Sequence, residues 1–570
     1  MLSIYMNIQS FHDTIYTVIH DAALSLGHPV PSFALEWKHE KTFGDYSTNI
    51  AFALAPHLKK NPHNIALHIQ EYIRTHHAAL FHTVTIAGGG FINLFCSDAF
   101  LSSSFTTLKK KPLSSFFSTP KKLLIEFSSP NIAKPMHVGH LRATLLGDFL
   151  ARLHTIVGNS VIRWNHLGDW GTQFGKLLYG YKHWNEKKET VEDLEQLYIH
   201  FHKKSETDPA LEDEARKEFL RLEKGDTENR NIWKHIVSLS LKEFQQTYAL
   251  LSISFDIVLG ESFYEKYIPH IFSLIEKSGK SQISDDALII DLESYDLPPG
   301  LLKKSDGATL YLTRDLASLY YRSTRFSPNT ILYVVGNEQS LHFKQLQAVA
   351  KEIDLPHAPF IHIPFGTVLD KNGKRFSTRA GRTVHARDLI NDVIQRAHSV
   401  GKEKESSASK KTLDAMGIAA LKYGMLSYNK TSPVTFDPES MLSLTGNSAP
   451  YIQYTYARAR RVVDKTSFLS RLFYTPRAYP SPSSSERTLL RAILEYPAVI
   501  QRCVDSATSQ YLTEYLYTLS GEINAFYEKE RVLGDTNKKR MYARIDLLKK
   551  ASSILKEGLS LLGIESPSVI

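Results

Sequence analysis

The fold is decided by one stretch of the chain, Leu123-Leu124-Ile125-Glu126-Phe127-Ser128-Ser129-Pro130-Asn131-Ile132-Ala133-Lys134-Pro135-Met136-His137-Val138-Gly139-His140. Its first five residues are apolar enough to predict a short buried strand, and a loop bounded by prolines follows. A helix is predicted next, because apolar side chains recur every four positions at Leu141, Leu145, Phe149 and Leu153. The stretch therefore predicts a strand–loop–helix unit.

Further strands and helices alternate along the middle of the chain. The sequence predicts strands at 161–164, 331–335 and 360–363 and a helix at about 341–353. Units of this kind imply a parallel sheet with helices on both faces. We therefore predict a multidomain α/β protein whose central domain is a doubly wound, Rossmann-like sheet.

The regions on either side of this sheet have different patterns. Residues 1–110 combine an amphipathic helix with two strand signals, which predicts a small α+β module. Residues 119–388 contain the sheet and are interrupted near 185–260 by a polar helical insertion. Residues 389–570 have a helical pattern, so we expect an all-α bundle there.

Composition narrows the class of protein. The chain has 570 residues, of which 42% are hydrophobic and 22% are charged, as in a globular protein that buries a core. Its 68 basic and 59 acidic residues give a net charge of +9, which favours a polyanionic partner. Two distant cysteines, Cys96 and Cys503, exclude a cysteine-rich zinc site and fit a reducing cytoplasm. With no apolar run near the roughly 18 residues of a membrane span and no basic residue before Lys38, we expect neither a membrane segment nor a targeting segment.

The two histidines of the opening stretch lie where free backbone N–H groups of a helix favour phosphate. His137 and His140 are three residues apart, so they share one helical face and can donate hydrogen bonds to the α-phosphate of a nucleotide. Gly139 between them would let a flat adenine approach the backbone. A surface or capping role is the alternative, whereas the spacing disfavours zinc. The position after a strand of a doubly wound sheet favours the nucleotide site.

The His-x-Gly-His element in this position resembles the signature of class I aminoacyl-tRNA synthetases. Longer segments resemble the arginyl-tRNA synthetase family, in order along nearly the whole chain, at 126–148, 165–175, 310–315, 447–458 and 561–564. The resemblance implies an arginine–tRNA ligase that activates L-arginine with ATP and then esterifies the 2′-hydroxyl of the terminal adenosine of tRNA(Arg). It also implies ATP with Mg²⁺ as co-substrate, no tightly bound cofactor or protein-held metal, and a cytoplasmic monomer.

An arginine pocket is implied by the same resemblance, at Glu126, Asn131, Tyr311, Asp315 and Gln339. A guanidinium is planar and permanently charged, so its pocket must supply acceptors. Glu126 and Asp315 would bind the guanidinium and α-ammonium groups between them, and which carboxylate takes which group stays open. The alternative is that each of these residues has only a structural role.

The second basic element of class I synthetases is a Lys-Met-Ser-Lys-Ser loop, which residues 370–382 resemble. Lys374 and Ser377 would contact ATP there, but Thr378 stands where the class has its second lysine. Lys134, before the histidine pair, would then supply the catalytic cation, and Arg379 of the loop is the competing candidate.

Two regions are expected to contact tRNA. Tyr451, Tyr454, Arg458 and Arg461 follow helical spacing, so tyrosines that stack on bases would alternate with arginines that meet phosphates. In the N-terminal module, the resemblance implies contact with the outer corner of tRNA through Tyr46, Asn49 and Phe91. Half-buried packing is the alternative for the tyrosines.

Three other functions remain as alternatives. A synthetase for glutamate or glutamine would need a cationic pocket, and one for cysteine would need a zinc site. A small nucleotidyltransferase shares His-x-Gly-His but leaves both flanking modules unexplained. An inactive tRNA-binding protein commonly loses one of the site residues that are present here, such as Glu126 or His137.

Overall fold

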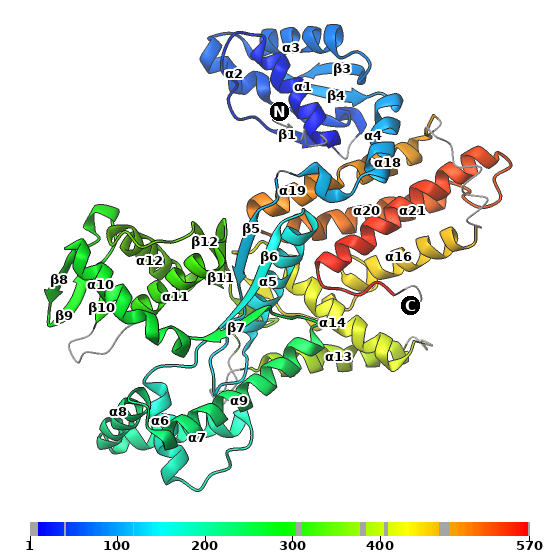
Figure 1. Ribbon diagram of the computed structural model, residues 1–570. Coiled ribbons are helices and arrows are strands. Elements are labelled where there is room, and N and C mark those ends of the chain that lie inside the picture. Colours follow the sequence, from blue (N-terminus) through cyan, green and yellow to red (C-terminus); the bar gives the residue numbers. More distant parts are fainter. Residues whose placement is uncertain are drawn as a thin grey trace.

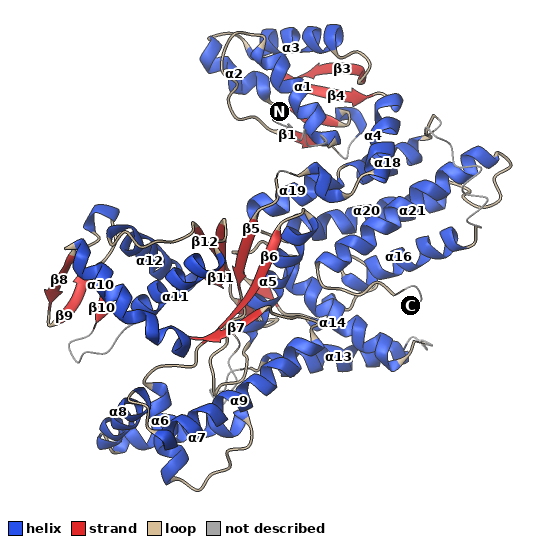
Figure 2. Cartoon of the chain, in the orientation of Figure 1, coloured by secondary structure: helices blue, strands red, loops and turns tan. Residues whose placement is uncertain are grey.

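The computed structural model describes residues 10–38, 41–117, 119–303, 311–374, 376, 384–403, 408–466, 479 and 481–567. A central parallel sheet joins three other regions (Figure 1). The N-terminal module lies at one end, the helices of the C-terminal half lie along one side, and a helical insertion extends from the other end. In Figure 2 the labelled strands lie in the N-terminal module and in the central region, and the C-terminal half is drawn mainly as helices.

The central sheet has five parallel strands in the order β12-β11-β5-β6-β7. They are β5 (Lys122–Glu126), β6 (Ser160–Leu167), β7 (Ile257–Gly260), β11 (Thr330–Gly336) and β12 (Phe360–Phe365). From β5 the chain adds β6 and β7 on one side, and it then returns to add β11 and β12 on the other. This order confirms the predicted doubly wound sheet, and it places the point where the winding reverses between β5 and β11.

Both faces of the sheet are buried, as a parallel sheet requires. Leu123 and Ile125 face α5 (Val138–Ile156) and the C-terminal helices, whereas Leu124 faces the opposite core. That second core is covered by α10 (Ile268–Ser278), α11 (Tyr311–Phe326) and α12 (Ser340–Glu352). Alternate residues of one strand therefore enter two different cores, which fixes the register of β5.

The N-terminal module is an antiparallel sheet of order β1-β2-β4-β3 packed against helices, which confirms the predicted α+β module. Its elements are α1 (Phe11–Leu24), β1 (Leu35–Trp37), β2 (Tyr46–Thr48), α2 (Ile50–Leu58), α3 (Pro62–His76), β3 (Phe81–Ala87), β4 (Phe91–Cys96) and α4 (Asp98–Lys110).

Two additions interrupt the central domain. The first is a helical group made of α6 (Gln173–His183), α7 (Val191–Thr207), α8 (Ala210–Glu223) and α9 (Thr227–Leu250). The second is a small antiparallel sheet, which the sequence did not predict, made of β8 (Ser281–Ser284), β9 (Ala287–Ile290) and β10 (Gly300–Lys303).

The C-terminal half is helical, as predicted, and one strand pair, β13 (Val368–Leu369) with β14 (Val434–Thr435), connects it to the central domain. Its helices are α13 (Ala386–Glu403), α14 (Lys410–Leu426), α15 (Pro438–Met441), α16 (Ala449–Asp464), α18 (Ser484–Leu494), α19 (Tyr496–Ser506), α20 (Gln510–Lys529) and α21 (Lys538–Leu561). Within the described residues, no helix combines the length and the apolar character that crossing a bilayer demands.

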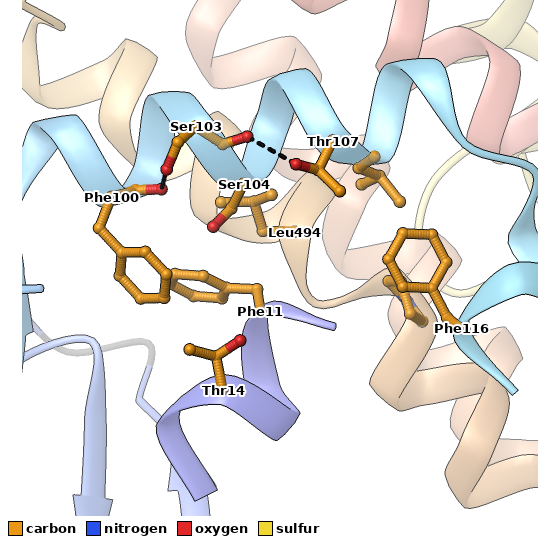
Figure 3. Close-up of a pocket in the computed structure, with 10 residues that line it drawn as sticks. Phe11, Thr14, Phe100, Ser103, Ser104, Thr107, Phe116 and Leu494 are labelled. Atoms are coloured by element: carbon orange, nitrogen blue, oxygen red, sulfur yellow. Dashed lines mark hydrogen bonds between the residues drawn. The ribbon is translucent and has the colours of Figure 1, made fainter. Parts of the chain in front are cut away.

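Buried ion pairs join the N-terminal module to α18. Asp45 pairs with Arg491 at 2.5 Å and with Arg487 at 2.8 Å, and the side chains of Asp45 and Arg491 are only 4% and 6% exposed. Asp45 also accepts a hydrogen bond from the backbone N–H of Cys96 at 2.6 Å. Apolar side chains from both sides line a cavity at this interface: Phe11 and Phe100 of the N-terminal module, whose ring centroids lie 4.9 Å apart, and Leu494 of α18 (Figure 3).

Asp45→Asn should destabilise the protein by about 3 kcal/mol, because it leaves the buried Arg491 without its counter-charge. Thermal unfolding monitored by calorimetry, together with limited proteolysis of the N-terminal module, measures this loss. Asp464→Asn is the matched control, since Asp464 pairs with Arg460 at 2.9 Å on the surface; its expected change is about 0.5 kcal/mol or less. Equal unfolding temperatures for the two variants would contradict this account of the interface.

Candidate active site

The candidate site lies at the carboxyl ends of β5 and β11, where the winding of the sheet reverses. Because all five strands are parallel, the segments that leave them emerge at one edge. The segment after β5 leads to His137, and the turn after β11 carries Glu338, whose charge acts on that histidine. Residues far apart in the sequence therefore meet at this edge.

The loop between β5 and α5 is held in a fixed shape by neighbouring elements. Ser128 and Ala133 have left-handed backbone angles, with φ of 74° and 62°. The hydroxyl of Ser128 bonds that of Tyr248 at 2.7 Å, and the N–H of Ala133 donates to Ser240 at 2.9 Å. Such unusual backbone angles persist only where the surroundings enforce them, so α9 braces the loop that presents the histidines.

His137 and His140 form a capping box at the start of α5. The Nδ1 atom of His137 accepts from the N–H of Gly139 at 3.1 Å, and the Nδ1 atom of His140 accepts from the N–H of His137 at 3.3 Å. Backbone nitrogens can only donate, so both rings carry their proton on Nε2 when neutral. The capping role that the sequence left as an alternative therefore coexists with two Nε2–H donors.

Burial keeps this imidazole pair uncharged. It lowers the pKa of His137, with a further lowering from Lys134 that Glu338 opposes. Burial also lowers the pKa of His140 well below the ordinary value, and His137 adds to that shift. The rings are stacked with centroids 3.7 Å apart. At neutral pH the two uncharged rings can thus donate hydrogen bonds from Nε2–H to phosphate oxygens.

Gly139 has a steric reason to be glycine that the sequence did not reveal. A Cβ atom at this position would lie 2.9 Å from Cε1 of the His137 ring. The glycine therefore preserves the ring orientation of its neighbour, in addition to any room that it leaves for a ligand.

Lys134 is exposed beside the histidines and lies over the ring of Tyr198, with Nζ 4.7 Å from the ring centroid. Tyr198 belongs to α7 of the helical insertion. The cation–π contact positions the ammonium group, and no acidic side chain in the described part of the chain pairs with it. The insertion thus contributes directly to the neighbourhood of the candidate catalytic lysine.

Glu126 ends β5 and is buried, with its side chain 7% exposed. Its Oε2 atom forms an ion pair with Nη1 of Arg322 on α11, a residue whose side chain is only 1% exposed. Burial alone would lower the pKa of Arg322, but the charge of Glu126 raises it. One oxygen of the predicted pocket acid is therefore occupied by an arginine of the protein itself.

Asp315 lies two turns before Arg322 on α11 and accepts a hydrogen bond from Nε2 of His342 at 2.6 Å. Burial would raise the pKa of Asp315, but the bond with His342 lowers it below its usual range. The same bond raises the pKa of His342 against the effect of burial. Asp315 is 33% exposed, so its carboxylate remains accessible at the edge of the sheet.

The other predicted pocket residues belong to the same elements or to neighbouring segments. Tyr311 begins α11 and is exposed, and Gln339 is exposed in the turn after β11. Asn131 is also exposed, and its Oδ1 would be 2.3 Å from any Cβ at Gly168, so that glycine makes room for its side chain. All five predicted pocket residues thus belong to the segments that meet at the carboxyl edge.

Of the basic loop, 370–382, the structure describes residues 370–374 and 376. Lys374 is exposed after a turn in which its backbone N–H donates to Asp370 at 2.9 Å. Ser377 and Arg379 lie outside the described residues. Beyond the loop, the chain returns to the histidines, because the N–H of Ala386 donates to the carbonyl of Met136 at 2.7 Å. The chain that follows the loop is therefore held beside the segment that carries the histidines.

The predicted tRNA residues of the N-terminal module have different environments. Phe91 is 47% exposed and available to a partner. Asn49 is partly buried, and its Oδ1 accepts from the N–H of Ala34 at 2.9 Å. Tyr46 is fully buried, and its hydroxyl donates to Glu495 of the C-terminal half. A direct contact between Tyr46 and RNA is thus incompatible with this structure; the residue joins two domains instead.

The four predicted residues of α16 are likewise not equivalent. Tyr454 is 54% exposed, and Arg461 is exposed in the last turn. Arg458 lies 4.2 Å from the ring centroid of Tyr527, and the hydroxyl of Tyr451 accepts from Asn524 at 3.1 Å. Tyr454 and Arg461 are thus exposed to a ligand, whereas Arg458 and Tyr451 contact residues of α20.

Several residues of this site were missed from the sequence. Arg322, His342 and Tyr198 lie in ordinary helical patterns, and nothing local marks them. His166 belongs to the segment 165–175 that resembles the family, and the charges of Glu126, Arg322 and Asp315 act on its pKa. Its proximity to both acids could have been suspected from its place at the end of a strand next to β5.

Models of known protein families match this chain in all three of its regions. Residues 106–438 match the model described as "tRNA synthetases class I (R), catalytic domain". Residues 9–96 match the arginyl-tRNA synthetase N-terminal domain, and 452–570 match the DALR anticodon-binding domain. The three matches follow the order of the N-terminal module, the central domain and the C-terminal helices.

Individual proteins are similar to this chain over nearly their full length. An arginine–tRNA ligase of Exiguobacterium sibiricum is 35% identical and covers 98% of this chain and 99% of its own length. One of Latilactobacillus sakei is 37% identical, covering 94% and 95%. Among solved structures, the arginyl-tRNA synthetase of Plasmodium falciparum has a TM-score of 0.84 at 25% identity, covering 99% of this chain and 100% of that one. The chain belongs to the arginyl-tRNA synthetase family of class I aminoacyl-tRNA synthetases.

Proposed function

We propose that the chain performs both steps of arginine–tRNA ligation at the carboxyl edge of its central sheet. In the first step, the carboxylate of arginine attacks the α-phosphorus of ATP, and the bond to the pyrophosphate oxygen breaks. In the second, the 2′-hydroxyl of the terminal adenosine of tRNA(Arg) attacks the arginyl carbonyl, and AMP leaves. The observation that carries this proposal is the combination of two Nε2–H donors with acidic side chains at one strand edge.

ATP would bind at the start of α5. His137 and His140 would donate from Nε2 to oxygens of the α-phosphate, and Gly139 would line the nucleotide. Lys374 and Ser377 would approach the departing phosphates, and Mg²⁺ would accompany ATP as its counter-ion. Phosphoryl-type transfer asks the protein mainly for positioning and charge stabilisation, which such donors supply.

Arginine would bind between Glu126 and Asp315, with Asn131, Tyr311 and Gln339 as further polar partners. The pocket offers carboxylate, amide and phenol oxygens, the acceptors that a guanidinium and an ammonium group need. The catalytic cation would be Lys134, because its charge already acts on His137 and no acid pairs with it among the described residues. Arg379 remains the alternative.

tRNA would contact both ends of the molecule. Tyr454 and Arg461 of α16, with Tyr451 and Arg458 behind them, would meet the anticodon loop, while Phe91 and the neighbouring Asn49 would meet the outer corner. We assign these roles to domains at 389–570 and 1–110, with catalysis at 119–388. Since one chain supplies every proposed site, we propose a monomer, and its free, buried Cys96 and Cys503 suit the cytoplasm.

Arginine-dependent exchange of pyrophosphate into ATP tests the proposed function. With ATP, Mg²⁺ and tRNA, the protein should exchange pyrophosphate when arginine is added and should not respond to glutamate, because the pocket acids repel a carboxylate side chain. Omitting tRNA shows whether activation depends on it, as the family resemblance implies. Exchange with glutamate instead of arginine would refute the proposed function.

Lys134→Ala should lower the rate of arginine activation about 100-fold or more, with little change in the KM for arginine, because the charge acts on the transition state. Exchange kinetics measure both quantities. Lys176→Ala is the matched control, since Lys176 also lies over an aromatic ring of the insertion, that of Phe201, and should retain wild-type exchange. Normal turnover by Lys134→Ala, with loss in Arg379→Ala, would transfer the role to the basic loop.

Asp315→Asn should raise the KM for arginine about 10- to 100-fold, because a charge-assisted contact to the substrate is lost. The KM for ATP should change little. Asp414→Asn controls for the loss of a histidine–aspartate pair as such, since His398 bonds Asp414 at the same 2.6 Å distance between α13 and α14. If the two variants had the same KM for arginine, Asp315 would not belong to the pocket.

A further inference from the structure

Arg322 has an unusual environment for an arginine. Its guanidinium lies 4.9 Å from the ring centroid of Trp164, 5.5 Å from that of Tyr333 and 5.9 Å from that of Tyr264. With a side chain only 1% exposed, it is enclosed by aromatic faces and one carboxylate, that of Glu126. Flat aromatic faces and a carboxylate are what binds a guanidinium well, so the protein has built an arginine site for its own side chain.

This internal site shares its acid with the proposed substrate pocket. Glu126 and Tyr333 are direct partners in the pairing of β5 with β11, and Asp315 precedes Arg322 by two turns of α11. The charge of Arg322 reaches Asp315 and His166 as well as Glu126. Arg322 is therefore part of the same electrostatic cluster as the groups that would receive arginine.

Without Arg322, the empty pocket would hold a buried carboxylate with no counter-charge between turnovers, which is costly in a protein interior. With it, the charge of Glu126 is balanced at Oε2. Among the described residues, Oε1 accepts one long hydrogen bond, of 3.5 Å, from the hydroxyl of Ser129, and it can exchange that bond for a ligand. The charges of Glu126 and Arg322 cancel. The negative charge of Asp315 therefore remains in the pocket, and it matches the excess positive charge of arginine.

We propose that Arg322 is a positioning residue for arginine recognition: it occupies Oε2 of Glu126 and leaves Oε1, together with Asp315, to receive the two cationic groups of the substrate. This inference rests on the proposed function. Arg322 contacts the pocket acid rather than the reacting atoms, so it acts through Glu126.

Replacing Arg322 should make arginine binding depend on pH. In Arg322→Met, the buried Glu126 loses its counter-charge, which favours the protonated form of its carboxyl group over the carboxylate. Burial shifts the pKa of the other groups facing Glu126 away from the neutral range: it lowers that of His166 and raises those of Tyr264 and Tyr333. The KM for arginine should therefore be high at low pH and fall as rising pH restores the carboxylate.

The test is to measure the KM for arginine and the KM for ATP by pyrophosphate exchange from about pH 6 to about pH 9. For Arg322→Met, we expect the KM for arginine to rise about 10- to 100-fold near neutral pH and to recover toward pH 9, with the KM for ATP within about twofold of wild type. Arg322→Lys retains the charge, so its KM for arginine should rise less and should not acquire this pH dependence.

Two further variants separate positioning from stability. Glu126→Gln combined with Arg322→Met removes both charges, which protein interiors tolerate; it should fold and show a raised KM for arginine that does not vary with pH. Arg544→Lys alters another buried arginine, one paired with Glu486 at 2.5 Å in the C-terminal bundle, and should leave the KM for arginine unchanged.

The inference is overturned if Arg322→Met and the double variant keep the wild-type KM for arginine, or if their KM values for arginine and ATP rise in parallel. If Arg322→Met fails to fold, the double variant and Arg322→Lys decide by the same criteria. A wild-type protein without arginine-dependent exchange would instead refute the proposed function, and this inference with it.

Discussion

The parallel pairing of β5 with β11 is the constraint on which the rest of the structure depends. It sets Glu126 beside Tyr333 and brings together the two segments that leave these strands. Because the winding reverses here, helices cover the sheet on both faces but leave its carboxyl edge open between β5 and β11. The histidine pair enters this edge from one strand, and the turn before α12 enters it from the other.

Single residues in this region serve structure and chemistry at once. His137 and His140 cap α5, and the same hydrogen bonds fix the tautomer that leaves Nε2–H free to donate. Arg322 balances a buried acid, and in doing so it leaves that acid with one open oxygen. In each case a group that stabilises the protein also determines which donors and acceptors a ligand would meet at the proposed site.

The sequence was sufficient for features that depend on local patterns. The apolar periodicity of α5 and the apolar residues of β5 predicted these two elements, and the order of motifs predicted the family. It was insufficient where distant segments meet. Tyr46 was expected on the surface because only tertiary packing reveals that Glu495 covers it, and Arg322 was missed because its acid lies nearly two hundred positions earlier in the chain, on β5. The strands of the β8–β10 sheet are too short to stand out by periodicity.

We propose that the imidazole donors and the acidic side chains at the carboxyl edge of the sheet bind ATP and arginine together. A crystal structure with a non-hydrolysable arginyl-adenylate analogue tests it most directly. The account predicts an oxygen of the phosphate mimic within about 3.2 Å of Nε2 of His137 or His140, and the cationic groups of the arginyl part against Asp315 and the open oxygen of Glu126. An analogue whose guanidinium and ammonium groups lie away from both acids, or whose phosphate mimic has no contact with the histidines, would contradict it.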